Sequence, residues 1–456
     1  MNFLRQVILN GGPEDSQQSR WELLSALSLW SCLCLLIAAV VVARAAGASL
    51  FLSHFGGREL ALVYIVVGLA VVAIVYGMSW ATHGIRYDRV AIGTILTLGF
   101  GTTIFRLILP ATAADDGNWV YGALYVFLET FALVTTMQVW TLANSLFSSA
   151  QAKRLYVFIA TGGILGSLFG GLATRSLYFL PTADLLWIVV GLCPPMIVAI
   201  RVFKSQARHL RQVVVKEPAV AVPPRDAEDA DPAETVSWIR HPVLRQRRVL
   251  RLASRLSLLA FLAAFTTNII DFYFKTYADE QFHGDTPALT QFFGSFYLLA
   301  GGLSLGMQVL LTPVIVRRAS VFVGLALTPV VLSGGTLLNL FGTTLFRATL
   351  LKLLDSGFAH SVQRSCTEML YTPLPPNLTG EIKLISEGVA GRVGLVMAGF
   401  VLWVLAPTLT PHRTLMLIAG LLAGWCVSLM ILKKVYQSAV TPAKPTALRD
   451  TGRRAA

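Results

Sequence analysis

The feature that most constrains this chain is a succession of apolar segments of about 20 residues, separated by short polar connections. A helix of that length crosses the hydrocarbon core of a bilayer. In lipid, only helices and closed barrels satisfy their own backbone hydrogen-bonding groups. A barrel would require short segments of alternating hydrophobicity, a pattern that does not occur here. The sequence therefore predicts an all-α, polytopic membrane protein with about twelve transmembrane helices.

Composition argues against several other classes of protein. The chain has 456 residues, of which 55% are hydrophobic and 13% charged. Its net charge of +13 could suggest nucleic-acid binding, but the basic residues gather in a few connections, as orientation signals do, so we expect no nucleic-acid partner. The five cysteines lie in apolar stretches, with spacing that suits neither zinc nor disulfides, and we expect no metal and no cofactor. The first twenty residues lack a signal-peptide core, so we expect helix 1 to be retained.

The apolar segments form two sets of six around a polar stretch. We expect the first set at 21–46, 60–80, 91–110, two helices within 129–175, and 185–203. We expect the second set at 252–277, 289–316, 321–340, 345–371, 384–406 and 415–435. These segments divide the chain into a cap (1–20), an N-terminal bundle (21–203), a basic linker (204–251), a C-terminal bundle (252–435) and a tail (436–456).

The linker changes character along its length. Residues 216–234 are rich in Pro, Ala and acidic residues, a composition typical of disorder. Residues 237–252 form a basic amphipathic stretch in which Trp238 is a candidate interfacial anchor. We interpret the linker as a cytoplasmic connection between two membrane halves, and a lipid or partner contact remains the alternative.

Charges in the connections predict the orientation. Cytoplasmic connections of membrane proteins carry an excess of Lys and Arg. With both termini in the cytoplasm of a bacterial inner-membrane protein, the basic residues fall inside and the acidic ones outside. The inside set is Arg86, Arg89, Lys153, Arg154, the linker, Arg317, Arg318, Lys433 and Lys434, and the outside set is Asp115, Asp116, Asp279, Glu280 and Asp285.

Residues 129–175 contain a polar stripe on an otherwise apolar helix. Glu129, Trp140 and Asn144 fall within about 60° on a helical wheel. A short basic turn at Lys153 and Arg154 is expected next, followed by a glycine-rich helix whose small face permits close packing. An acidic residue inside a membrane helix is a functional candidate, although a packing stripe without a ligand is the alternative.

The two halves repeat the same plan. Glu129 and Asp355 lie 226 positions apart, and three glycine pairs share an offset of 228. A literal echo, FGTTIFR at 100–106 and FGTTLFR at 341–347, has an offset of 241. Two parallel six-helix halves are the plan of major facilitator transporters, which bind substrate between the halves near mid-membrane. The glycine pairs are Gly163–Gly391, Gly166–Gly394 and Gly171–Gly399.

Charged residues concentrate in the segment 345–371. Lys352 and Asp355 are spaced to pair on one helix face, which we expect to point toward a central cavity. Arg364 and Glu368 form a second candidate pair nearer the cytoplasmic end, and with Lys153 and Arg154 they are candidate gate residues. Asp271 and Lys275 repeat the i to i+4 spacing in the helix at 252–277, and the helix at 384–406 adds Glu387 and Arg392.

These residues define a candidate site. A cavity containing Arg44, Lys275 and Lys352 would suit an anionic substrate. Glu129, Asp271 and Asp355 could then balance those charges or carry a coupling proton. The alternative is that the pairs only tie helices together. The full candidate set for substrate binding or coupling is Arg44, Glu129, Asn144, Asp271, Lys275, Lys352 and Asp355.

Three stretches of the chain (42–65, 129–159 and 354–394) resemble the bacterial and plastid ATP/ADP translocases, including their bacterial major facilitator relatives. The resemblance implies a twelve-helix fold and, as in the best-known members, exchange of ATP for ADP and phosphate by means of buried acids and lysines. Glu129, Asn144 and Lys153 match family positions. The family's lysine-bearing pattern around helices 1 and 2 is replaced here by Arg44 and Arg58.

The sequence thus predicts a secondary transporter rather than an enzyme. It would move a small anionic solute, with nucleotides as the first candidate, across the lipid bilayer by alternating access. Two alternatives remain open: a proton-coupled exporter of a non-nucleotide cargo, and a non-transporting membrane scaffold or sensor.

Overall fold

The computed structural model describes residues 15–81, 85–112, 119–144, 147, 149–216, 247–318, 320–371 and 382–440. These residues are almost entirely helical and contain no strand. Among them, ten helices are long and apolar enough to cross a membrane. The described part of the chain is therefore that of an all-α, multi-pass membrane protein, as predicted.

The first half is formed by six long helices, most of them longer than predicted. Arg44 lies well inside the first of these helices, rather than near its outer end as expected, because the helix continues to Leu52. The bounds are α2 (Asp15–Leu52), α3 (Gly57–Ala81), α4 (Tyr87–Thr112), α5 (Trp119–Asn144), α6 (Ser149–Ser176), a 3-10 turn η1 (Thr182–Asp184) and α7 (Leu185–Lys216).

The second half repeats the plan, but π-helical turns interrupt several of its rods. The segments predicted at 321–340 and 345–371 have the expected bounds, although the second contains a π turn that the sequence pattern did not reveal. The bounds are α9 (Arg247–Phe282), α10 (Thr286–Gly306), η4 (Met307–Leu311), α11 (Thr312–Arg318), α12 (Val321–Leu340), α13 (Leu345–Phe358), η5 (Ala359–Gln363), α14 (Arg364–Tyr371), η6 (Leu384–Ala390), α16 (Gly391–Leu405), η7 (Ala406–Thr408) and α17 (Pro411–Val440).

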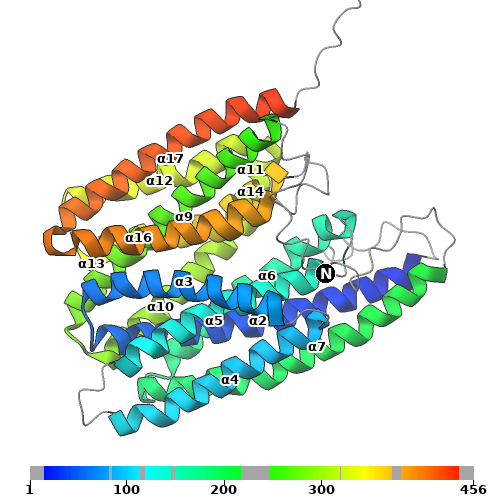
Figure 1. The fold of residues 1–456 in the computed structure, drawn as a ribbon, viewed down its shortest axis with the longest axis horizontal. Helices are drawn as coiled ribbons and strands as arrows, with labels where there is room; N and C mark the ends of the chain where they lie inside the picture. The colour runs from blue at the N-terminus through cyan, green and yellow to red at the C-terminus, as the bar shows by residue number, and fades with distance from the viewer. Residues whose placement is uncertain are drawn as a thin grey trace, which may run out of the picture.

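The long helices run roughly side by side along one axis of the molecule (Figure 1). The short connections 53–56, 177–184, 283–285, 341–344 and 406–410 lie at one end, which we call the hairpin end. Helix α2 begins, and α7 and α17 finish, at the opposite or terminal end, on the right of Figure 1. Residues 1–14 of the predicted cap (1–20), 217–246 of the predicted linker (204–251) and 441–456 of the predicted tail (436–456) lie outside the described residues, and the remaining parts of these segments are helical ends of α2, α7, α9 and α17.

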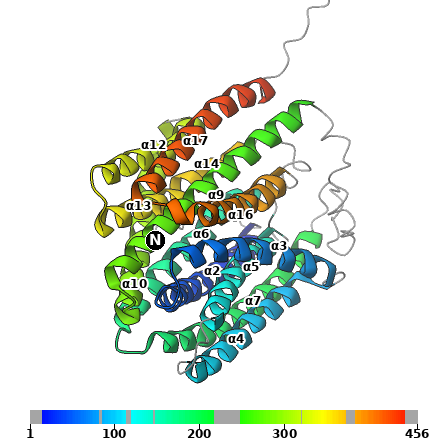
Figure 2. The same cartoon turned by 60° about the vertical axis from the view of Figure 1, so that its left-hand side comes forward.

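Each half has its own apolar core. One core lies entirely within α2–α7, and the other is centred on α9–α17 and also takes in residues of α2, α3 and α5. The most extensive contacts between the halves are those of α6 with α10 and of α3 with α16 (Figures 1 and 2), and α10 also packs against α2. The halves therefore meet along two seams, and side chains at mid-length of α2, α5, α9 and α13 can reach one another between these seams.

The glycine spacing predicted an internal repeat, and two of the three glycine pairs make corresponding contacts; in the third, a Cβ on Gly163 would touch Leu33 of α2, whereas one on Gly391 meets nothing within 4 Å. A Cβ on Gly171 would lie 2.5 Å from the backbone nitrogen of Leu298 in α10, and one on Gly399 would lie 2.7 Å from the carbonyl oxygen of Ala61 in α3. Gly171 and Gly399 thus form the close contact of each seam. Another predicted pair behaves in the same way within the halves, because Gly166 packs on α2 and Gly394 packs on α9.

Two local expectations were wrong. The echo FGTTIFR lies inside α4, whereas FGTTLFR spans the connection between α12 and α13, where Gly342 has a φ of +156° and Thr344 caps α13. The strings are alike, but their structural positions are not equivalent. The expected basic turn at Lys153 and Arg154 is instead helical and lies within α6.

We expect Gly166→Ala to lower the free energy of unfolding by about 1–3 kcal/mol, since overpacking a close contact costs roughly that much. A Cβ there would press on the backbone of Cys34 and Ala38. Gly191 in α7 is the matched control, because a Cβ added there meets nothing within 4 Å. Thermal unfolding in detergent measures both variants, and equal melting temperatures would contradict the prediction.

Candidate substrate site between the two halves

Four charged residues of the second half form one connected network. The Asp271 carboxylate accepts from Lys275, with Nζ 2.7 Å from Oδ2, and from Lys352, with Nζ 3.2 Å from Oδ1. Lys352 also donates to Asp355 over 3.0 Å, and Asp355 accepts from Thr267 over 2.9 Å. Both i,i+3 and i,i+4 pairs predicted from the sequence are present, but Asp271 also joins them into one chain of charges.

This network is withdrawn from solvent. The side chains of Asp355, Lys275 and Lys352 are 2%, 7% and 10% exposed, whereas that of Asp271 is 21% exposed. Burying a charge is costly unless it is paired, and removing one partner leaves an uncompensated charge in a poorly polar environment. The pairing therefore stabilises each charge in the middle of a membrane protein.

Two tyrosines of the first half extend the network across the interface. Tyr64 in α3 donates its hydroxyl hydrogen to Asp271 over 2.7 Å. Lys275 donates to the hydroxyl oxygen of Tyr125 in α5, also over 2.7 Å, and its ammonium lies over both tyrosine rings. Sequence reasoning missed both tyrosines. The position of Tyr125, one helical turn before Glu129, was a usable signal.

A second ion pair lies in the first half. The Arg44 guanidinium contacts the Glu129 carboxylate, with Nη2 2.9 Å and Nε 3.1 Å from Oε2. The side chain of Arg44 is 34% exposed and that of Glu129 is 14% exposed, so this pair is the more accessible of the two groups. Arg392 of α16 lies in the electrostatic reach of Arg44, and its hydrogen-bond contact is with the sulfur of Met137, 3.8 Å away.

The internal repeat relates the two groups. Arg44 and Asp271 are 227 positions apart, as are Tyr125 and Lys352, while Glu129 and Asp355 are 226 apart. Equivalent positions on the first and fourth helices of each half therefore carry charged or hydrogen-bonding groups. Arg44 of the first half corresponds to Asp271 of the second, so a cation in one half is replaced by an anion in the other. The two halves therefore place polar groups at equivalent positions but differ in the charges that these groups carry.

The candidate gate residues of the second half form a separate, more exposed network near the terminal end. Arg364 pairs with Glu368 over 2.8 Å and with Glu387 over 3.2 Å, and Lys383 pairs with Glu368 over 2.7 Å. This network ties α14 to η6. The gate partners expected from α6, Lys153 and Arg154, and the candidate Asn144 at the end of α5, have side chains outside the described part of the structure.

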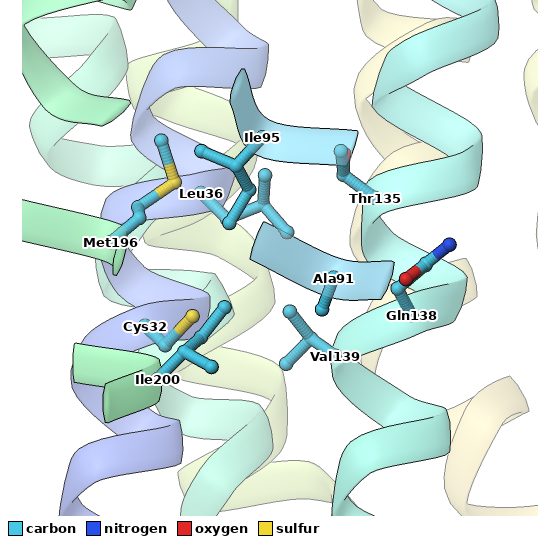
Figure 3. Close-up of a pocket in the computed structure, with 9 residues that line it drawn as sticks. All are labelled: Cys32, Leu36, Ala91, Ile95, Thr135, Gln138, Val139, Met196 and Ile200. Atoms are coloured by element: carbon cyan, nitrogen blue, oxygen red, sulfur yellow. The ribbon is translucent and has the colours of Figure 1, made fainter. Parts of the chain in front are cut away.

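Two pockets lie away from the charged network. Figure 3 shows a small pocket between α2, α4, α5 and α7, where Thr135 and Gln138 stand among apolar side chains such as Cys32 and Met196. A larger pocket of about 400 Å³ opens at the hairpin end, beside Arg58 and Glu280. The small pocket carries no charged group and does not suit an anion.

The arrangement between the halves can bind an anion. Three cations, Arg44, Lys275 and Lys352, each contact at least one of three carboxylates there, Glu129, Asp271 and Asp355. Lys and Arg are strong partners for carboxylate and phosphate groups. Among the described residues, no cluster of His, Cys, Asp or Glu has the geometry of a metal site.

Comparison with known proteins assigns a family to this architecture. Residues 109–362, more than half of the chain, match the TLC ATP/ADP transporter family. ADP,ATP carrier protein 3 of Rickettsia bellii is 22% identical over 334 residues, which cover 64% of this chain and 65% of the relative. The same carrier of Rickettsia conorii is 22% identical over 336 residues, with the same coverage. The match thus spans slightly less than two thirds of these relatives.

Solved structures share the fold at low sequence identity. The D-xylose-proton symporter has a TM-score of 0.59 at 12% identity, covering 90% of this chain and 97% of the symporter. The human organic anion transporter MFSD10 gives 0.58 at 17%, covering 90% and 99%, and the nucleoside transporter NupG gives 0.56 at 14% with the same coverage. The chain has the major facilitator fold and belongs to the TLC ATP/ADP transporter family.

Proposed function

We propose that this protein is a secondary transporter that moves a small anionic solute by alternating access, with exchange of adenine nucleotides as its leading activity. The observation that carries the proposal is the set of cations at the interface of the halves, formed by Arg44, Lys275 and Lys352. Its position between two repeats of a major facilitator fold supports a substrate site there. Its charge favours phosphate-bearing substrates, and membership of an ATP/ADP transporter family supports nucleotides in particular.

The candidate residues divide into two roles in this proposal. Arg44, Glu129, Asp271, Lys275, Lys352 and Asp355 bind the substrate or balance its charge, together with Asn144. The network of Arg364 and Glu368, with Lys153 and Arg154 from α6, forms a gate at the terminal end.

The protein is proposed to lie in a bacterial inner membrane with both termini in the cytoplasm. The distribution of basic residues supports this orientation, because they concentrate in connections at the terminal end. We also propose the division into a cap (1–20), two bundles (21–203 and 252–435), a linker (204–251) and a tail (436–456). The hairpin end then faces the outside.

In this orientation, the conformation is closed toward the outside. Close backbone contacts of α6 with α10 and of α3 with α16 involve Gly171, Gly294 and Gly399 on the hairpin side of the molecule. Thr182 and Thr290 share a buried hydrogen bond of 3.0 Å at the same end. These contacts would have to separate for substrate to reach the site from that side.

We expect Gly171→Leu to shift the protein toward the conformation open at the hairpin end. Even a Cβ at this position would lie 2.5 Å from the backbone of α10. A penalty of about 1–3 kcal/mol on the closed form changes a two-state population by about 5- to 150-fold. Distances between spin labels at Tyr178 and His283, both exposed at the hairpin end, measure the shift after the native cysteines are replaced.

The control for this experiment is Gly306→Leu in α10, the helix that Gly171 of α6 contacts, since a Cβ at Gly306 meets nothing within 4 Å. It should leave the distance distribution as in the wild type. If the distance between the labels at Tyr178 and His283 in Gly171→Leu is the same as in the wild type, the proposed movement is contradicted.

The function itself is tested by exchange in proteoliposomes. Vesicles loaded with ADP should take up labelled ATP in a protein-dependent manner, and uptake should stop when internal ADP is omitted. Uptake of phosphate or another organic anion, but of no nucleotide, would show that the transported substrate is that anion and not a nucleotide. Uptake driven only by a proton gradient would favour a proton-coupled carrier. Absence of uptake for every anion, in protein that is folded and inserted, would leave a non-transporting membrane protein.

A further inference from the structure

We propose that Asp271 is an internal substitute for the anionic group of the substrate, and that an oxyanion such as phosphate displaces it to bind Lys275 and Lys352. This inference rests on the proposed function. It assigns a phosphate-sized binding position to the space that the Asp271 carboxylate occupies, and a competitor role to Asp271 itself.

The geometry of the carboxylate carries the argument. Each oxygen of Asp271 contacts a different lysine, Oδ2 with Lys275 at 2.7 Å and Oδ1 with Lys352 at 3.2 Å. A carboxylate that bridges two ammonium groups offers them the same arrangement of two charged oxygens that a phosphate would offer. The two lysines come from different helices, α9 and α13, so they converge on this anion from two sides.

Burial indicates which group can leave. The side chain of Asp271 is 21% exposed, while those of the two lysines are 7% and 10% exposed. Asp271 is therefore more accessible than the two lysines it bridges, so an incoming oxyanion would reach the carboxylate more readily than either cation. Asp355 is the contrasting case, because it is 2% exposed and accepts from Thr267 beneath the network.

An empty site needs such an anion. Asp355 can balance Lys352, but without Asp271 the other lysine, Lys275, would be an uncompensated charge in the middle of a membrane protein, which is strongly destabilising. Asp271 provides the counter-charge when no substrate is present. A second anion in contact with the same lysines would repel Asp271, so binding and displacement are coupled through charge.

Displacement would also act on the interface between the halves. Asp271 holds the hydroxyl of Tyr64 from the first half at 2.7 Å. When the carboxylate moves away from the lysines, this link between α3 and α9 is lost or rearranged. Substrate binding would thereby weaken one contact that joins the halves, which connects occupancy of the site to the conformational change.

The test compares anion affinity in the full-length protein. Titration calorimetry with inorganic phosphate, ADP and adenosine is carried out on the wild type and on Asp271→Asn, which keeps the shape of the side chain and removes its charge. We expect the dissociation constants of phosphate and ADP to fall about tenfold or more, since one nearby like charge is removed. Uncharged adenosine should show no such gain. Tightening for phosphate alone would assign the position to the free ion, and tightening for both would assign it to the terminal phosphate of the nucleotide.

Two further variants keep the test valid if Asp271→Asn does not fold. Tyr64→Phe removes one hydrogen bond that holds the carboxylate and keeps every charge, so we expect a several-fold gain in phosphate affinity. Tyr125→Phe is the matched control. It removes a hydrogen bond to Lys275 and leaves the carboxylate held as before, so it should give no gain.

Anion affinity that is unchanged or weaker in both Asp271→Asn and Tyr64→Phe would overturn the inference. In that case, wild-type exchange of ADP for ATP in proteoliposomes would show that the proposed function stands and only the competitor role fails. If neither binding nor exchange of any anion occurs in the wild type or in the variants, both proposals are wrong.

Discussion

Lys352→Ala is expected to lower the free energy of unfolding by about 3–5 kcal/mol, because removing one partner of a buried ion pair leaves its counter-charge uncompensated. Asp355, 2% exposed, would retain only Thr267 as a hydrogen-bond donor. Nucleotide exchange in proteoliposomes is expected to fall about 30-fold or more, since losing a charged contact in a desolvated site costs about 2–5 kcal/mol.

The double variant Lys352→Met with Asp355→Asn separates the two effects. Replacing a buried ion pair by neutral groups of similar volume is often neutral for stability. The double variant should therefore unfold close to the wild type, while exchange remains lost because the cation that binds substrate is still missing. Exchange at the wild-type rate in either variant would show that Lys352 does not bind the substrate.

Arg44→Ala is expected to lower the exchange rate at least about tenfold, with a smaller effect on stability than Lys352→Ala. The side chain of Arg44 is 34% exposed, more than those of the other two cations, Lys275 and Lys352. Arg44 is therefore placed to contact substrate directly. Its charged hydrogen bonds to Glu129 are worth about 1.5–3 kcal/mol of stability. We expect exchange to fall by at least about tenfold for each 1.4 kcal/mol of lost substrate contact.

Arg106→Ala is the matched control for this variant. Arg106 pairs with Asp184 between α4 and η1, within the same half and away from the central network. Its removal should reduce stability while leaving exchange by the folded protein intact. If Arg106→Ala impairs exchange as much as Arg44→Ala does, the loss reflects general destabilisation of the half and not a role of Arg44 in the substrate route.

The spacing of glycines and charges carried more information than the literal repetition of a motif. Offsets of 226–228 residues predicted that Gly171 corresponds to Gly399 and Glu129 to Asp355, and the members of each pair occupy equivalent positions in the two halves. The repeated string FGTT does not occupy equivalent positions. A close helix contact requires a small residue at one particular place, whereas a short string can be accommodated in a helix or in a turn.

Some features of the candidate site had no local signal. The pairs Lys352–Asp355 and Asp271–Lys275 follow from helix geometry, because residues three or four apart share a face. The contact of Asp271 with Lys352, and the bonds of Tyr64 and Tyr125 across the halves, join segments that are distant in the chain. The π turns in the second half likewise gave no periodic pattern that could be read from the residues.

The sequence by itself determined the helical, multi-pass character of this protein, the twofold repeat and the pairings within single helices. Each of these depends on segment length, residue spacing or local geometry. Only the tertiary structure decided that one carboxylate, Asp271, bridges two lysines and reaches the other half through Tyr64. The physical reason is that contacts between helices depend on how far each helix is rotated and shifted against its neighbours, and packing at Gly171 and Gly399 sets those positions.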